Sequence, residues 1–344
     1  MIVRIEKGVE KSILFFFMRK EVKMMYVLAI DGGGTKTSAV LCDEHGNIYA
    51  KVVTTRSNPT AMNLHYFEST IHTIMQNLQR QNSQVFSAIH SCYAGMAGVK
   101  ELYAERTVEE IVRQYVPSKA IISVENDAII ALYSGTLGQA GIVQIAGTGA
   151  ITMGYDLQQT FHRVGGWGYL FDDEGSGYDL GAQALKAIFQ GYDGRGRATA
   201  LTDAILNYFA VANVPQLIEC IYGEEHPRTV VAPLSKYVAA MADQGDEVAN
   251  KILEDACQKH YRAIKSCYKQ MIWGTEHVPV VLVGGVFKNE GYFLPKLQQL
   301  ANADDIPLQF ITPLLPPIGG AVIAALKELN IQPYPSFIET FQKK

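Results

Sequence analysis

Two segments of this chain have the same order of apolar runs and turns, so the fold must contain the same structural unit twice. In both 27–53 and 141–166 an apolar run is followed by a Gly/Thr turn, a second apolar run, a polar turn and a third run. Alternation of this kind predicts two three-stranded meanders. Helical patterns follow the meanders, at 66–80 and 180–189. We therefore predict an α/β fold built from two similar halves.

The turns of the two meanders, "DGGGTK" and "AGTG", suggest anion binding. Glycine turns leave backbone N–H groups accessible because no Cβ blocks the approach, and threonine hydroxyls add donors. Facing each other, two such turns would hold a polyphosphate from both sides. Asp31 ends the first strand of the first meander, and a carboxylate buried there needs a partner such as Mg²⁺, held largely through water. The alternatives are a plain glycine-rich hairpin and, for Lys36, a solvated turn lysine.

Three further segments carry candidate chemistry. The apolar run 278–283 ends in Gly284-Gly285, and a second pair, Gly319-Gly320, opens a predicted helix over 321–329. Asp127, in "SVENDAII", lies between a predicted strand and a predicted helix. It is either a helix N-cap or a general base that orients a hydroxyl and accepts its proton during phosphoryl transfer.

The glycine-rich segment 163–185 contains Trp167 and the acids Asp172, Asp173 and Glu174. Carboxylates accept hydrogen bonds from sugar hydroxyls, and an aromatic ring covers the apolar face of a sugar. The alternative is a long acidic surface loop.

Taken together, the motifs Gly-Gly-Gly-Thr, Asn-Asp-Ala, Ala-Gly-Thr-Gly and Gly-Gly-Trp-Gly…Asp-Glu-Gly-Ser resemble those of the N-acetylglucosamine kinases. These enzymes form part of the BadF/BadG/BcrA/BcrD ATPase branch of the actin, Hsp70 and sugar-kinase superfamily. The resemblance implies a duplicated actin-like (ribonuclease H-like) ATPase fold, with two domains around a nucleotide and sugar cleft. The implied domains are 25–138 and 139–330, with a tail, 331–344, that returns to the first domain.

The resemblance also implies an activity: ATP-dependent phosphorylation of an amino sugar, N-acetylglucosamine at its 6-hydroxyl first, with glucosamine or N-acetylmuramic acid as alternatives. Asp127 would be the base, and Asp31 would hold Mg²⁺. The implied sugar contacts are Asn58, Asp127, Gly165, Gly166, Trp167 and Asp173. The implied ATP contacts are Gly33, Gly34, Thr35, Lys36, Thr37, Gly147, Thr148, Gly149, Gly284 and Gly285.

Other classes fit less well. Related ATPases that activate iron–sulfur dehydratases carry a cysteine close to the Ala-Gly-Thr-Gly turn, but this chain has none between Cys92 and Cys220. An actin-like switch protein without kinase activity remains the alternative of another class.

Composition sets the remaining limits. The net charge of −4 argues against a nucleic-acid partner. Five scattered cysteines without a Cys-x-x-Cys pair argue against a disulfide framework and fit the cytoplasm. The apolar run around 13–18 is too short to span a membrane. We expect 1–24 to be an extension outside the fold and, from the resemblance, a possible homodimer.

Overall fold

The computed structural model describes residues 24–34, 36–59, 62–100, 103–274 and 277–343, so the expected extension 1–24 falls almost wholly outside the described residues. Within them, the strands form two five-stranded sheets with the orders β3-β2-β1-β4-β5 and β10-β9-β6-β7-β8. The first contains β1 (Tyr26–Gly32), β2 (Lys36–Asp43), β3 (Ile48–Thr55), β4 (Ile89–Met96) and β5 (Ile121–Glu125). The second contains β6 (Gly141–Ala146), β7 (Ala150–Tyr155), β8 (Phe161–Gly165), β9 (Val278–Val283) and β10 (Leu308–Ile311).

The two sheets have the same topology. Read from the other edge, the second order is β8-β7-β6-β9-β10, which repeats the succession of the first sheet. In each sheet the first three strands form an antiparallel meander, and the last two run parallel to the meander's first strand. The predicted duplicated α/β fold is confirmed.

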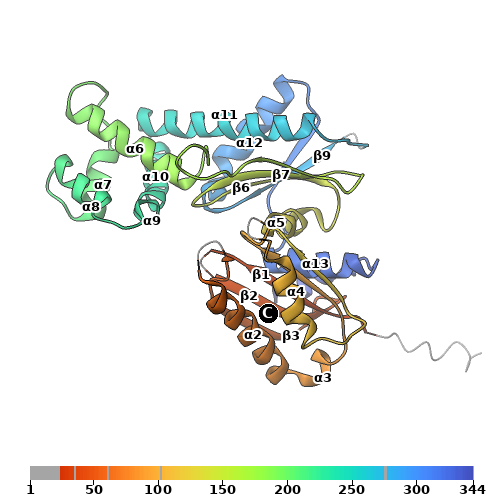
Figure 1. The fold of residues 1–344 in the computed structure, drawn as a ribbon. Coiled ribbons are helices and arrows are strands. Elements are labelled where there is room, and N and C mark those ends of the chain that lie inside the picture. Colours follow the sequence, from red (N-terminus) through yellow and green to blue (C-terminus); the bar gives the residue numbers. More distant parts are fainter. Residues whose placement is uncertain (1–23, 35, 60–61, 101–102, 275–276, 344) are drawn as a thin grey trace, which may run out of the picture.

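Helices separate the sheets and cover their outer faces. Figure 1 shows two lobes, one around each sheet, with α5 and α13 between them. A group of helices, α6 to α10, lies at the far end of the second lobe. The helices are α2 (Leu64–Gln81), α3 (Ser83–Phe86), α4 (Glu105–Arg113), α5 (Asp127–Thr136), α6 (Gly177–Tyr192), α7 (Leu201–Phe209), α8 (Leu217–Tyr222), α9 (Pro227–Val231), α10 (Ser235–Asp243), α11 (Glu247–Lys269), α12 (Glu290–Ala303), α13 (Pro317–Glu328) and α14 (Phe337–Gln342).

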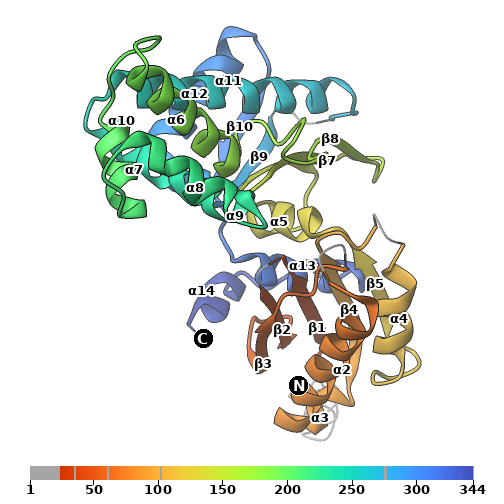
Figure 2. The same cartoon turned by 60° about the vertical axis from the view of Figure 1, so that its left-hand side comes forward.

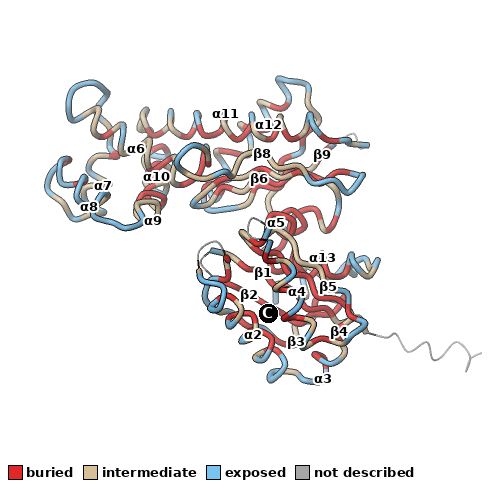
Figure 3. The backbone as a smooth tube through the Cα atoms, in the orientation of Figure 1, coloured by how far each residue is buried: buried red, intermediate tan, exposed pale blue. Residues whose placement is uncertain are grey.

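The buried side chains follow the sequence periodicity. Strands β1 and β2 are buried almost throughout, whereas α2 buries only one face, with Phe67, Ile71, Ile74 and Leu78 fully covered by the first sheet's core. Each such side chain contributes about 1.5–3 kcal/mol when removed from water. Figure 3 shows this burial concentrated in the two sheets and in the helices between the lobes.

Contact between the lobes depends on the close approach of α5 and α13. A Cβ on Gly320 would collide with the carbonyl oxygen of Ile130, so only glycine allows this packing. The predicted helix over 321–329 begins earlier, at Pro317, because proline is favoured in the first turn of a helix. Gly319 and Gly320 therefore lie inside α13 and serve helix packing instead of opening the helix.

The end of the chain packs against the first lobe. The rings of Phe337 and Phe341 in α14 are buried, and the N–H of Tyr334 donates to the carbonyl of Glu44 at 3.2 Å. The Tyr334 ring also stacks on His45, with centroids 3.9 Å apart. The last helix thus lies beside the β2–β3 turn (Figure 2).

Within the described residues, no single helix combines the length and apolar composition needed to cross a membrane. Among the residues that the structure describes, one pair of helices, α7 and the neighbouring Val214–Tyr222, has the required length and composition when taken together, but the pair is bent by 53°.

Candidate active site

Candidate site residues of the first lobe gather at one edge of its sheet. Asp31, Gly95 and Glu125 are in register across β1, β4 and β5, which run parallel. The backbones of Asp31 and Glu125 therefore lie about 10 Å apart, two strand spacings. Asp127 follows Glu125 at the same edge. In open α/β sheets, ligands bind outside the carboxyl ends of the parallel strands, which is where these carboxylates lie.

Asp31 has the properties of a residue that needs a cation. Its burial raises the pKa of its carboxyl to about 6, and nearby Lys36 opposes this shift. A cation beside the carboxylate would offset the cost of desolvating its charge. The described residues contain no cluster of three or more His, Cys, Asp and Glu side chains that could hold a metal ion. A lone carboxylate of this kind suits a hard cation that keeps most of its water, as Mg²⁺ does when it binds through one or two carboxylates and phosphate.

Asp127 lies in the first turn of α5 without being its cap. Asn126 is the N-cap, because its side-chain oxygen accepts the N–H of Ala128 at 2.9 Å. The N-cap interpretation of Asp127 is therefore wrong. Its neighbour Glu125 forms an ion pair with Lys100 at 2.5 Å. A carboxylate in the first turn of a helix is favoured by the helix dipole, so the structure keeps Asp127 in a position suited to an ionised acid.

The first glycine turn, residues 32–36, is closed by a hydrogen bond from the Gly33 N–H to the Lys36 carbonyl at 3.0 Å. The predicted ATP contact Thr35 lies outside the described residues. Lys36 is exposed, whereas Thr37 is fully buried and donates its hydroxyl to Ser57 Oγ at 2.7 Å. Ser57 also donates its N–H to the Gly33 carbonyl. The segment that carries the predicted sugar contact Asn58 is thus tied to the first turn.

The second glycine turn, residues 146–150, is braced by the start of α6. The Gly147 N–H donates to the Gly149 carbonyl at 2.9 Å. The carbonyls of Gly147 and Thr148 in turn accept the N–H groups of Gly177, at 2.7 Å, and Tyr178, at 3.3 Å. Because α6 fixes the carbonyls of this turn, the exposed Thr148 is presented on a rigid loop.

The double glycine after β9 meets the second turn. Gly284 has a φ of +116°, and a Cβ there would collide with the carbonyl of Ala146. By contrast, a Cβ on Gly34, Gly147 or Gly285 would meet no atom within 4 Å. These three glycines therefore present open backbone faces on both lobes. Such faces fit the close approach of a nucleotide's phosphates.

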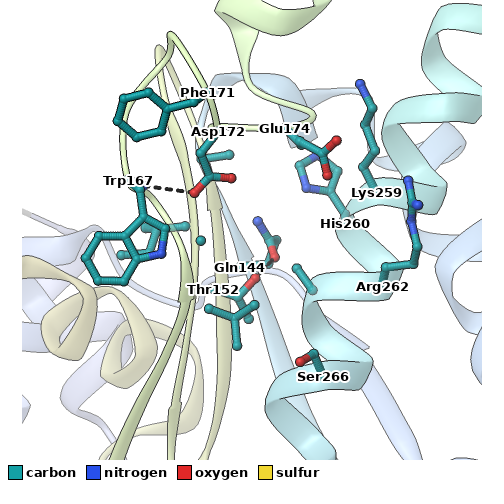
Figure 4. Close-up of a pocket in the computed structure, with 15 residues that line it drawn as sticks. Gln144, Thr152, Trp167, Phe171, Asp172, Glu174, Lys259, His260, Arg262 and Ser266 are labelled. Carbon is teal, nitrogen blue, oxygen red and sulfur yellow. Dashed lines mark hydrogen bonds between the residues drawn. The ribbon is translucent and has the colours of Figure 1, made fainter.

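The predicted sugar-binding loop, residues 165–176, starts with two glycines in the left-handed region, Gly165 at φ +74° and Gly166 at φ +76°. The Trp167 N–H donates to Asp172 Oδ2 at 2.9 Å (Figure 4), and the Arg163 guanidinium lies 4.2 Å above the Trp167 ring. With 63% of its surface exposed, Trp167 is held at the surface as a platform. Asp172 therefore braces the loop.

Asp173 occupies a different environment from its neighbours in the loop. It is only 4% exposed, and its Oδ2 accepts a hydrogen bond from Arg228 Nη2 at 3.1 Å. A Cβ added to Gly149 would lie 2.7 Å from the same carboxylate oxygen. Burial raises the pKa of the Asp173 carboxyl, and Arg228 and the Ala150 N–H oppose that shift. Asp173 thus connects the sugar-binding loop to the second glycine turn.

A cavity of about 710 Å³ lies between the second sheet and α11, beside the loop (Figure 4). All of its lining residues belong to the second lobe, and they include Trp167, Asp172, Lys259, His260 and Arg262. Burial lowers the pKa of His260 to about 4, so its ring is neutral at pH 7.

The predicted sugar contacts are divided between the lobes, with Asn58 and Asp127 on the first and the others on the second. Sequence reasoning missed Ser57 and Arg228. Their approach to the glycine turns depends on tertiary packing and not on a local motif.

The chain is similar to known kinases over most of its length. It is 30% identical over 322 residues to the N-acetyl-D-glucosamine kinase of Dictyostelium discoideum, an alignment that covers 90% of this chain and 99% of that protein. It is 29% identical over 310 residues to the N-acetylmuramic acid/N-acetylglucosamine kinase of Clostridium acetobutylicum, covering 89% and 100%.

A solved structure shows the same fold. The crystal structure of a candidate N-acetylglucosamine kinase from Porphyromonas gingivalis superimposes with a TM-score of 0.68 at 20% identity, covering 89% of this chain and all of that one. Residues 28–326 match the BadF/BadG/BcrA/BcrD ATPase family. This match covers most of the chain, so the chain belongs to the BadF/BadG/BcrA/BcrD ATPase family.

Proposed function

We propose that this chain transfers the γ-phosphoryl group of ATP to the 6-hydroxyl of an amino sugar, with N-acetylglucosamine as the first candidate. ATP use follows from membership of an ATPase family, and the relatives from Dictyostelium discoideum and Clostridium acetobutylicum are named as amino-sugar kinases. The observation that carries the proposal is the placement of Asp127. It stands at the sheet edge shared with Asp31, in a helix whose cap is supplied by Asn126.

The phosphates of ATP would lie between the two glycine turns. The backbone N–H group of Gly34 and the side chains of Lys36 and Thr148 would contact them, with the open face of Gly147 beside them and Gly285 nearer the nucleoside. Asp31 would hold Mg²⁺ through water. When bound, this ion neutralises phosphate charge and aligns the terminal phosphate for transfer.

Asp127 would act as the general base. Its carboxylate accepts the proton of the sugar 6-hydroxyl as the oxygen forms a bond to the γ-phosphorus. The bond from that phosphorus to the bridging oxygen breaks, and ADP leaves with the electron pair. Positioning and electrostatic stabilisation supply most of the acceleration in such transfers, so the rigid support of Asp127 by α5 matters as much as its charge.

Sugar recognition would use both lobes. Asn58 belongs to the first lobe, whereas the contacts on the sugar-binding loop belong to the second: Gly165, Gly166, Trp167 and Asp173. A sugar that engages both sets favours an arrangement in which the lobes approach each other. Approach of this kind excludes water, which would otherwise compete with the sugar for the phosphoryl group.

N-acetylmuramic acid is the second candidate acceptor, since the relative from Clostridium acetobutylicum is named for both sugars. Glucosamine is the third, because the chain is also 26% identical over 188 residues to a glucosamine kinase of Vibrio cholerae.

A direct test measures ADP release from Mg-ATP with each sugar in turn. The panel contains N-acetylglucosamine, N-acetylmuramic acid, glucosamine, N-acetylmannosamine, glucose and a blank without sugar. We expect release well above the blank with at least one amino sugar, and a product that carries phosphate on O6. Release equal to the blank with every sugar would overturn the proposal.

A further inference from the structure

Arg228 reaches the second glycine turn from a distant part of the chain. It lies in α9, within the helical group at the end of the second lobe. Its Nη2 donates to Asp173 Oδ2 at 3.1 Å, and its guanidinium lies 5.6 Å from the centre of the Tyr169 ring. A Cβ on Gly149 would collide with the same guanidinium. The charge of Arg228 is therefore held directly against the second turn.

The ion pair leaves much of the guanidinium unused. A guanidinium carries five N–H donors in a fixed fork, and the hydrogen bond to Asp173 uses one of them. The Arg228 Nε is buried and has no hydrogen-bond partner among the described residues. The side chain nevertheless remains 37% exposed, against 5% for Asp173. The exposed part of the guanidinium, and not its buried Nε, is therefore what an incoming ligand can reach.

We propose that Arg228 is a phosphate-binding residue whose remaining donors bind the terminal phosphates of ATP at the second glycine turn. A planar fork suits bidentate contact with phosphate oxygens. Asp173 orients that fork and keeps it against Gly149. Lys36 is an exposed cation within the first glycine turn, so each lobe would bring a cation to the polyphosphate.

The arrangement also connects the two substrates. Asp173 belongs to the sugar-binding loop, and its carboxylate positions the residue that would bind phosphate. Movement of this loop on sugar binding would therefore move Arg228 relative to the second turn.

This inference rests on the proposed function only for the location of the ATP phosphates, so it can be tested without sugar. Isothermal titration would measure binding of Mg-ATP, Mg-ADP and AMP to the wild type, Arg228→Gln and Arg228→Lys. Arg195→Gln is the matched control, because Arg195 is an exposed arginine that pairs only locally with Asp193. Thermal unfolding of each variant would check the fold.

We expect Arg228→Gln to lose about ten- to a hundredfold in ATP affinity, the usual worth of a charged hydrogen bond, while AMP affinity stays within about twofold. The ATP affinity of Arg228→Lys should lie between those of the wild type and Arg228→Gln, because lysine keeps the charge but lacks the planar fork of donors. Arg195→Gln should match the wild type.

Two results would overturn the inference. One is ATP affinity in Arg228→Gln equal to that of the wild type. The other is an equal loss for ATP and AMP together with a lower unfolding temperature, which would make the residue purely structural. Selective loss of ATP affinity in a protein that phosphorylates no sugar would instead contradict the proposed function and leave the role of Arg228 intact.

Discussion

Replacing Asp31 with asparagine should stabilise the metal-free protein at neutral pH, even though it removes a proposed functional group. The pKa of this carboxyl is about 6 in the folded chain against 3.8 when unperturbed, because burial disfavours its charge. At 1.36 kcal/mol per pKa unit, the difference corresponds to about 3 kcal/mol. Above pH 6 Asp31 is ionised in both states. The free energy of unfolding is then lowered by this full amount, because the unfolded chain keeps the same charge in water.

The pH dependence fixes the sign of the effect. Well below the unfolded pKa of 3.8 the carboxyl is protonated in both states, and the destabilisation is absent. As pH rises from 4 through 6, the unfolded chain ionises first, so the wild type loses stability relative to Asp31→Asn. The free energy of unfolding of the variant should therefore exceed that of the wild type by only about 0.5 kcal/mol at pH 4 and by about 3 kcal/mol at pH 8.

Urea unfolding in EDTA at pH 4, 6 and 8 measures this difference. Asp193→Asn serves as the control, because Asp193 is exposed and far from the turns in sequence. Adding Mg-ATP should reverse the order, since binding stabilises the folded wild type more than the variant. If Asp31→Asn is no more stable than the wild type at pH 8 without metal, burial of the ionised Asp31 does not destabilise the folded protein, and the reasoning is refuted.

Three other substitutions test separate parts of the structure. Gly149→Ala should weaken ATP binding by about tenfold or more in a nucleotide titration, because its Cβ would displace the guanidinium and carboxylate held at the second turn; unchanged affinity would contradict the packing. Asn126→Ala should cost about 1 kcal/mol in urea unfolding through the lost α5 cap, and no cost would mean that another group caps the helix. Gly320→Ala should lower the unfolding temperature by several degrees, because the added Cβ would collide with the Ile130 carbonyl oxygen of α5. An unfolding temperature equal to that of the wild type would show that α5 and α13 can move apart without cost.

The meanders and their turns could be predicted from sequence because their signals are local. Each meander, with its apolar runs and its Gly/Thr turn, fits within about 25 residues of sequence. The observed strands Lys36–Asp43 and Ala150–Tyr155 follow that pattern. The duplication follows from the same pattern repeated.

Features set by tertiary packing could not be predicted in this way. Asn126 and Asp127 are both good cap residues one position apart, so only the observed hydrogen bond to Ala128 separates their roles. The sequence gives no sign that Gly320 faces α5, because a glycine in a helix and a glycine at its start look alike. Arg228 reaches the second turn only through the packing of the helical group, and no motif surrounds it.

The Asp127→Asn variant is the sharpest test of whether Asp127 is the base of a sugar kinase. The measurement is the steady-state rate of sugar phosphorylation at saturating Mg-ATP, together with the dissociation constant of the sugar. We expect kcat to fall by about 10²–10⁴-fold while the sugar dissociation constant changes by a few fold, because asparagine keeps the shape of aspartate but cannot accept the proton. A folded Asp127→Asn variant that turns over at a rate near that of the wild type would contradict it.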